Sequence, residues 1–118
     1  MNRPVHFELA ANDPEKLVAF YSETFGWKIS KWDGPMDYWL ITTGDDETNG
    51  INGAIISREV LQQAVVNTIE VASMDRALES VGSNGGSTVA GPREIPGVGM
   101  HAYCVDPEGT VFGLLQPA

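Results

Sequence analysis

The sequence predicts an α+β domain of two β-α-β-β-β modules that form one cup-shaped mixed sheet with helices on its outer face. Three observations lead to this prediction. A stretch at residues 7–13 recurs at residues 69–75, each copy alternates apolar and polar residues, and each is followed by one helical and three strand patterns. The 118 residues fit a single domain, 1–118, with modules at 1–57 and 66–118.

The repeat is clearest at the two opening strands. Phe7–Asp13 corresponds to Ile69–Asp75 at an offset of 62 residues, with three identical positions and three conservative ones. Strand alternation predicts that one face meets the helices and the opposite, concave face lines the cup. The helix-facing residues would be Phe7, Leu9, Ile69 and Val71, and the concave ones His6, Glu8, Thr68 and Glu70.

Each opening strand leads into a predicted helix. In the first, Asp13 is a suitable N-cap, Pro14 suits the first helical position, and Gly26 ends the helix. In the second, Ser73 can cap the start and Gly82 is expected at the end. Apolar residues recur at helical spacing in both, at Leu17, Val18, Tyr21 and Phe25, then at Ala77, Leu78 and Val81.

Three strands are expected in the rest of each module. They span residues 27–31, 38–43 and 51–56 in the first module and 87–90, 100–105 and 111–116 in the second. Turn residues separate them at 33–35, 44–50 and 106–109. The segment 57–65 joins the modules, and we expect it to be helical in part.

Composition narrows the classes of partner. The net charge is −9, from 7 Lys and Arg against 16 Asp and Glu, and the cations are scattered, which argues against nucleic acid and anionic membranes. No apolar run approaches the ~20 residues of a membrane span. Cys104 is the single cysteine, so neither an intrachain disulfide nor a cysteine-based zinc site within one chain is possible. The sequence shows no signal-peptide pattern, so we expect a cytoplasmic protein. The predicted cup indicates a small molecule as its partner.

Several short motifs resemble the glyoxalase/bleomycin-resistance/dioxygenase superfamily, which has the vicinal oxygen chelate fold. The resemblance spans nearly the whole chain and implies that fold, and it also implies a homodimer. It does not settle the reaction, because the superfamily includes isomerases, dioxygenases, epimerases and drug-sequestering proteins. The motifs are His6-Phe7-Glu8, Asp13-Pro14-Glu15, Phe20-Tyr21, Phe25-Gly26-Trp27, Gly85-Gly86, the loop at 95–99 and the stretch 106–114.

The resemblance also identifies where metal-dependent members hold a divalent metal. The four positions correspond to His6, Thr68, Gly53 and Gly113. Glycine has no donor atom and threonine is a weak ligand, whereas a metal site normally needs at least three protein ligands. We therefore expect no catalytic metal and no other cofactor, with a divalent metal held by Glu8, Glu70 or His101 as the remaining alternative.

His6, Glu8 and Glu70 are the candidate catalytic residues. A histidine suits proton transfer near neutral pH, and two carboxylates in a partly dry cup could divide the roles of acid and base. The alternatives are a histidine bonded to a neighbour or to water, and two solvated carboxylates too far apart to interact.

Five further residues are candidate ligand contacts: Tyr38, Trp39, Arg93, His101 and Tyr103. One of Tyr38 and Trp39 should line the cup, while the other lies in the helix-facing core. His101 and Tyr103 share a face, which is either the concave face or the outer one. Arg93 is placed in a Pro/Gly loop, as a lid residue that meets an anionic ligand or as a solvated cation.

Three functions therefore remain open. The first is metal-independent binding of a small organic molecule, of bleomycin-resistance type. The second is a metal-independent lyase or isomerase in which His6 acts with Glu8 or Glu70 on a small carbonyl compound. The third is a divalent-metal-dependent glyoxalase- or dioxygenase-like enzyme.

Overall fold

The computed structural model describes the whole chain, Met1–Ala118. It divides into two compact units, which are described separately. The first unit is His6–Val66, and the second unit is Asn67–Ala118 together with Met1–Val5. The N-terminal residues therefore belong to the second unit, where the Asn2 backbone N–H donates to the Glu70 carbonyl at 2.6 Å.

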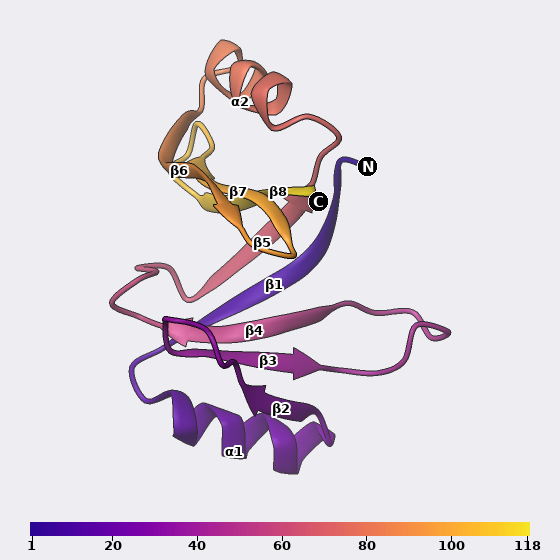
Figure 1. Ribbon diagram of the computed structural model, residues 1–118. Helices are drawn as coiled ribbons and strands as arrows, with labels where there is room; N and C mark the ends of the chain where they lie inside the picture. Colours follow the sequence, from indigo (N-terminus) through magenta and orange to yellow (C-terminus); the bar gives the residue numbers. More distant parts are fainter. The chain divides into compact units, whose positions relative to one another are not determined.

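The element order is β-α-β-β-β twice, as the sequence predicts (Figure 1). The first set is β1 (Arg3–Ala11), α1 (Pro14–Phe25), β2 (Lys28–Lys31), β3 (Tyr38–Thr42) and β4 (Asn52–Ser57). The second set is β5 (Val65–Glu70), α2 (Met74–Ser83), β6 (Ser87–Ile95), β7 (Gly99–Val105) and β8 (Val111–Pro117). The α+β class and the repeated module are thereby confirmed.

Each unit contains a mixed four-stranded sheet with the same pattern of pairing. The order is β2-β3-β4-β1 in the first unit and β5-β8-β7-β6 in the second. The opening strand pairs in parallel with the last strand of its own set, β1 with β4 and β5 with β8, and the other neighbours are antiparallel. The two halves are therefore equivalent in strand topology as well as in sequence.

The predicted helix starts are confirmed by their caps. The Asp13 carboxylate accepts the Lys16 N–H at 3.3 Å, and the Ser73 hydroxyl accepts the Arg76 N–H at 3.3 Å. Gly26 ends α1 in the left-handed conformation, at φ 72°. The expected end at Gly82 is wrong, because α2 continues to Ser83 and is capped at Asn84.

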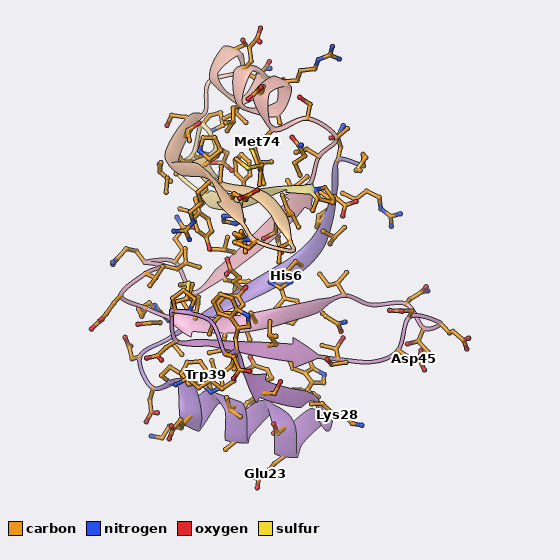
Figure 2. All side chains as sticks on the ribbon, viewed as in Figure 1. His6, Glu23, Lys28, Trp39, Asp45 and Met74 are labelled. Carbon is orange, nitrogen blue, oxygen red and sulfur yellow. The ribbon has the colours of Figure 1, made fainter.

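Each sheet buries one face against its helix. In the first unit Phe7, Leu9 and Trp39 pack around Ile41 and Ile55, with Leu17 and Val18 of α1. In the second unit Ile69 and the buried Val71 pack with Cys104, Leu114 and residues of α2. Met74, labelled in Figure 2 at the start of α2, is 3% exposed and belongs to this core. The predicted helix-facing positions are therefore confirmed.

Two strand predictions are corrected. Strand β6 runs to Ile95, past the expected end at residue 90, and its register with β7 shifts twice between Thr88 and Arg93. The Pro/Gly residues that indicate a loop there lie instead in an irregular edge strand, where proline is tolerated. The joining segment 57–65 forms turns, not a helix. Neither helix is long and apolar enough to cross a membrane.

Candidate functional site

Three polar side chains of the first unit form a hydrogen-bonded chain. The Tyr38 hydroxyl donates to Glu8 Oε2 at 3.1 Å, and His6 Nε2 lies 3.1 Å from the same hydroxyl oxygen. Two of the three predicted catalytic residues are therefore linked through a residue predicted only as a ligand contact.

Strand register explains how residues so far apart in the chain come together. Strand β4 lies between β1 and β3, and Ile56 of β4 pairs with Ala10 on one side and Tyr38 on the other. Paired residues share a face, so Tyr38 lies on the face of His6 and Glu8. Ala54 separates Glu8 from β3, and its small side chain leaves room for the tyrosine to reach across.

Burial determines the electrostatics of the three hydrogen-bonded side chains. Glu8 is only 3% exposed, and a buried carboxylate is costly unless hydrogen bonds support it, as Tyr38 does here. Burial lowers the pKa of His6 below its ordinary value of 6.5, which favours a neutral imidazole at neutral pH. Burial and the Glu8 carboxylate raise the pKa of Tyr38, so its hydroxyl keeps its proton.

Trp32 supports Tyr38 and was not predicted as a site residue. The two rings meet edge to face with centroids 5.9 Å apart, and the Trp32 backbone N–H donates to the Tyr38 backbone carbonyl at 2.7 Å. A side chain at Gly34 would overlap the Trp32 ring, so the glycine permits this packing. The Asp33-Gly34-Pro35 turn signal was present in the sequence, but it did not indicate which way the tryptophan folds back.

The choice between Tyr38 and Trp39 is resolved by the same alternation. Trp39, labelled in Figure 2, pairs with Ile55 and packs in the core with α1 residues. It therefore lies on the opposite side of the sheet from Tyr38. Of the two alternatives, Tyr38 is the residue on the His6 face and Trp39 lies in the helix-facing core, because adjacent strand residues face opposite ways; Trp39 as a candidate ligand contact is thereby corrected.

In the second unit the face of His101 and Tyr103 is also resolved. Their rings meet edge to face at 4.5 Å, while the neighbours Ala102 and Cys104 belong to the core against α2. A Cβ placed at Gly113 would lie 2.9 Å from Thr68 Oγ1 and 3.3 Å from His101 Nε2. Thr68, His101 and Tyr103 therefore share the face that does not pack on the helix.

Glu70 and Arg93 also belong to the second unit. Glu70 is half-buried and pairs with Leu115, whereas Arg93 is exposed and pairs with His101. The loop location predicted for Arg93 is wrong, since it lies within β6. Its register position nevertheless places it beside His101 in the sheet.

The positions that hold a metal in related proteins do not fit one in this chain. The expected inward position of Gly53 is wrong: Gly53 pairs with Phe7, and a Cβ there would lie 2.5 Å from the Phe7 carbonyl oxygen. Asn52 shares the His6 face instead, and its Oδ1 already accepts the Thr43 N–H at 2.9 Å. Neither unit contains a group of three or more His, Cys, Asp or Glu side chains arranged to hold a metal ion.

Comparison with known proteins gives a family match along most of the chain. A family model described as Glyoxalase/Bleomycin resistance protein/Dioxygenase superfamily matches residues 3–114. The chain is 28% identical over 113 residues to the proposed glyoxylase CFP32 of Mycobacterium bovis, and equally to that of Mycobacterium tuberculosis. The alignment covers 94% of this chain and 42% of those relatives, so the chain spans less than half their length.

Solved structures show the same fold. A Streptomyces coelicolor methylmalonyl-CoA epimerase in complex with 2-nitronate-propionyl-CoA has a TM-score of 0.75 at 15% identity, covering 100% of this chain and 96% of its own. The Mycobacterium tuberculosis methylmalonyl-CoA epimerase has a TM-score of 0.72 at 13% identity, covering 98% and 87%. The hypothetical protein BH1468 of Bacillus halodurans has a TM-score of 0.73 at 12% identity, covering 98% and 94%. At these identities the likeness concerns the fold alone.

Proposed function

Because the chain belongs to the Glyoxalase/Bleomycin resistance protein/Dioxygenase superfamily, we propose that it binds a small organic molecule without a catalytic metal. The binding face is that of the first unit on which His6, Tyr38 and Glu8 lie. The hydrogen-bonded chain of these three side chains is the observation that carries the proposal. Ligand sites combine an apolar surface with a few placed polar groups, and these three side chains would supply the polar groups.

Charge indicates the class of ligand. The chain carries a net charge of −9, and Glu8 adds a buried carboxylate to the proposed site. A ligand with several negative charges would be repelled, whereas a neutral or cationic compound would not. We therefore favour such a compound over the coenzyme A esters bound by the epimerases. Arg93, His101 and Tyr103 remain predictions as ligand contacts, and Glu70 remains a prediction as a catalytic residue. The module boundaries, the homodimer and the cytoplasmic location also remain predictions.

Thermal unfolding with and without ligands tests this function. The protein is first dialysed against EDTA and then screened with neutral and cationic metabolites, with methylmalonyl-CoA as the anionic comparison. A ligand present at 100 times its Kd stabilises the folded state by about 2.7 kcal/mol and raises the midpoint. Tyr38→Phe should weaken the shift, and Tyr21→Phe, which removes a hydroxyl from α1, should not.

Two outcomes would contradict metal-free binding. One is that no compound raises the midpoint of the wild type more than that of Tyr38→Phe. The other is that the shift occurs only after Mn²⁺ or Co²⁺ is added back.

A second function, proton transfer by a metal-independent lyase or isomerase, is favoured by the lowered pKa of the half-buried His6, since a neutral imidazole can accept a proton. His6 would take a proton from the carbon beside a carbonyl group, and the electron pair of that C–H bond would move into the carbonyl to give an enolate. Glu8 would stabilise the resulting imidazolium through the Tyr38 hydroxyl. Return of the proton to another position or face would complete an isomerisation.

Deuterium exchange tests this second function without knowledge of the natural substrate. Hydroxyacetone and methylmalonyl-CoA are incubated with the protein in D₂O, and incorporation next to the carbonyl is followed by NMR. If proton transfer occurs, His6→Ala should slow it by roughly 10²- to 10⁴-fold. Glu8→Gln and Glu70→Gln form a matched pair, and a larger loss with Glu8→Gln identifies the carboxylate that acts with His6. No exchange above the uncatalysed rate would count against this function.

A further inference from the structure

The hydrogen-bonded chain in the first unit has a defined direction. Tyr38 has a single hydroxyl proton, and that proton is donated to Glu8 Oε2. The hydroxyl oxygen then offers only lone pairs to His6 Nε2, which lies 3.1 Å away. A hydrogen bond at that distance requires a proton on Nε2, because two acceptors do not bond to each other.

We infer that Tyr38 is a positioning residue that holds His6 in the Nε2–H tautomer and so leaves Nδ1 as a hydrogen-bond acceptor for the ligand. Glu8 sets the direction, because its Oε2 accepts the hydroxyl proton of Tyr38. In proteins, the hydrogen bond made by one imidazole nitrogen determines whether the other nitrogen carries a proton or acts as an acceptor. The Tyr38 contact has this role for His6, with no metal involved.

The free nitrogen of His6 is open to a ligand. The Tyr38 contact is the one hydrogen bond of the His6 side chain, so Nδ1 has no protein partner. The one buried side-chain nitrogen or oxygen without a hydrogen bond is Arg58 Nε, so Nδ1 is not enclosed. Nδ1 is therefore an unpaired acceptor that keeps some exposure to solvent.

This inference rests on the proposed ligand-binding function and narrows its ligand class. A molecule that meets Nδ1 must bring a hydrogen on nitrogen, on oxygen or on an activated carbon. A carboxylate or an ether oxygen has none to give. The same nitrogen would be the base in the proton-transfer reaction described above, which links the two candidate functions to one atom.

Nitrogen NMR of the ligand-free protein tests the tautomer directly. The side-chain nitrogens of ¹⁵N-labelled protein are recorded above the ordinary histidine pKa of about 6.5. We expect His6 Nε2 to show the shift of a protonated ring nitrogen and Nδ1 that of an unprotonated one. We also expect a through-space contact between the Nε2 proton and the Tyr38 ring.

Tyr38→Phe removes the acceptor and keeps the ring. The preference for Nε2–H over Nδ1–H should fall by about fivefold, the effect of one hydrogen bond of ordinary strength. Tyr21→Phe should leave it unchanged.

A wild-type His6 with the proton on Nδ1, or on both nitrogens, would overturn the inference, as would an unchanged preference in Tyr38→Phe. If that variant does not fold, the wild-type spectrum decides alone. Because no ligand is present, a failed ligand screen leaves this result intact, and the wrong tautomer leaves the binding proposal intact.

Discussion

Tyr38 donates its hydroxyl proton to Glu8 over 3.1 Å, although the two residues are 30 positions apart in the chain. The contact joins β3 to β1 across the intervening strand β4. It therefore gives a buried carboxylate a partner and also joins three strands of the first unit. This double role makes its removal measurable in stability as well as in ligand binding.

Replacing Tyr38 by phenylalanine should destabilise the fold. The change removes a donor from the buried Glu8 carboxylate and the partner of His6, while the ring contact with Trp32 remains. We expect a loss of about 1–3 kcal/mol in the free energy of unfolding, measured by urea denaturation. Tyr21→Phe is the control and should change stability by less than half a kcal/mol or so. A Tyr38→Phe variant as stable as this control would contradict the structural role of the hydroxyl.

The lowered pKa of His6 predicts how stability depends on pH. In the unfolded chain this histidine binds a proton near its ordinary value of 6.5, whereas in the folded protein it does so at a lower pH. Between the two values the unfolded state holds more protons, so the free energy of unfolding rises with pH. The His6 contribution is therefore intact above 6.5 and is lost as pH falls from 6.5 towards the folded value.

Comparison with His6→Gln isolates this effect from the many carboxylates. Glutamine does not titrate, so the difference in free energy of unfolding between wild type and variant should shift against the wild type on acidification. Urea denaturation at a series of pH values measures the difference. A constant difference, or one that moves in favour of the wild type at low pH, would contradict a lowered His6 pKa.

The sequence predicted the parts of the fold that depend on local chemistry. Both helix starts were predictable because Asp13 and Ser73 are good capping residues, and the end of α1 because Gly26 adopts a left-handed conformation readily. The repeat predicted the equivalent topology of the two halves. The predicted end of β6 was too early, because glycine and proline are typical of loops. In this strand they lie instead in a bulged edge strand.

The candidate site was only partly predictable, because it depends on strand register. His6 and Glu8 could be placed on one face by alternation within β1. Tyr38 could be distinguished from Trp39, and Gly53 from its neighbour Asn52, only once the pairings with β4 were known. A shift of one residue moves a side chain to the other face of a sheet, and the sequence did not define the turns before and after β3 closely enough to fix its register.

Alanine at Gly113 should destabilise the second unit. The added methyl carbon would lie 2.9 Å from Thr68 Oγ1 and 3.3 Å from His101 Nε2, so both side chains must move. We expect a cost of about 1–3 kcal/mol, measured by urea denaturation. Gly53→Ala should cost more, because its nearest atom is the Phe7 backbone oxygen at 2.5 Å, which cannot rotate away.

Gly82→Ala serves as the matched control for these glycine changes. Gly82 lies in α2 with no atom near the added carbon, so alanine should stabilise the helix by about 0.5–1 kcal/mol. A Gly113→Ala variant at least as stable as wild type would show that Thr68 and His101 do not converge on this position.

Cys104 should report on the unfolding of the second unit. Its side chain is fully buried in β7, between β8 and β6, and burial raises the pKa of its thiol. The thiolate is the reactive form, so a disulfide reagent such as dithionitrobenzoate should react very slowly in native buffer. The rate should rise with urea in parallel with unfolding followed by far-ultraviolet circular dichroism, and the fully unfolded protein should react as a free cysteine does. Rapid reaction in native buffer, or a rate insensitive to urea, would contradict the burial of this strand and of the core that packs against α2.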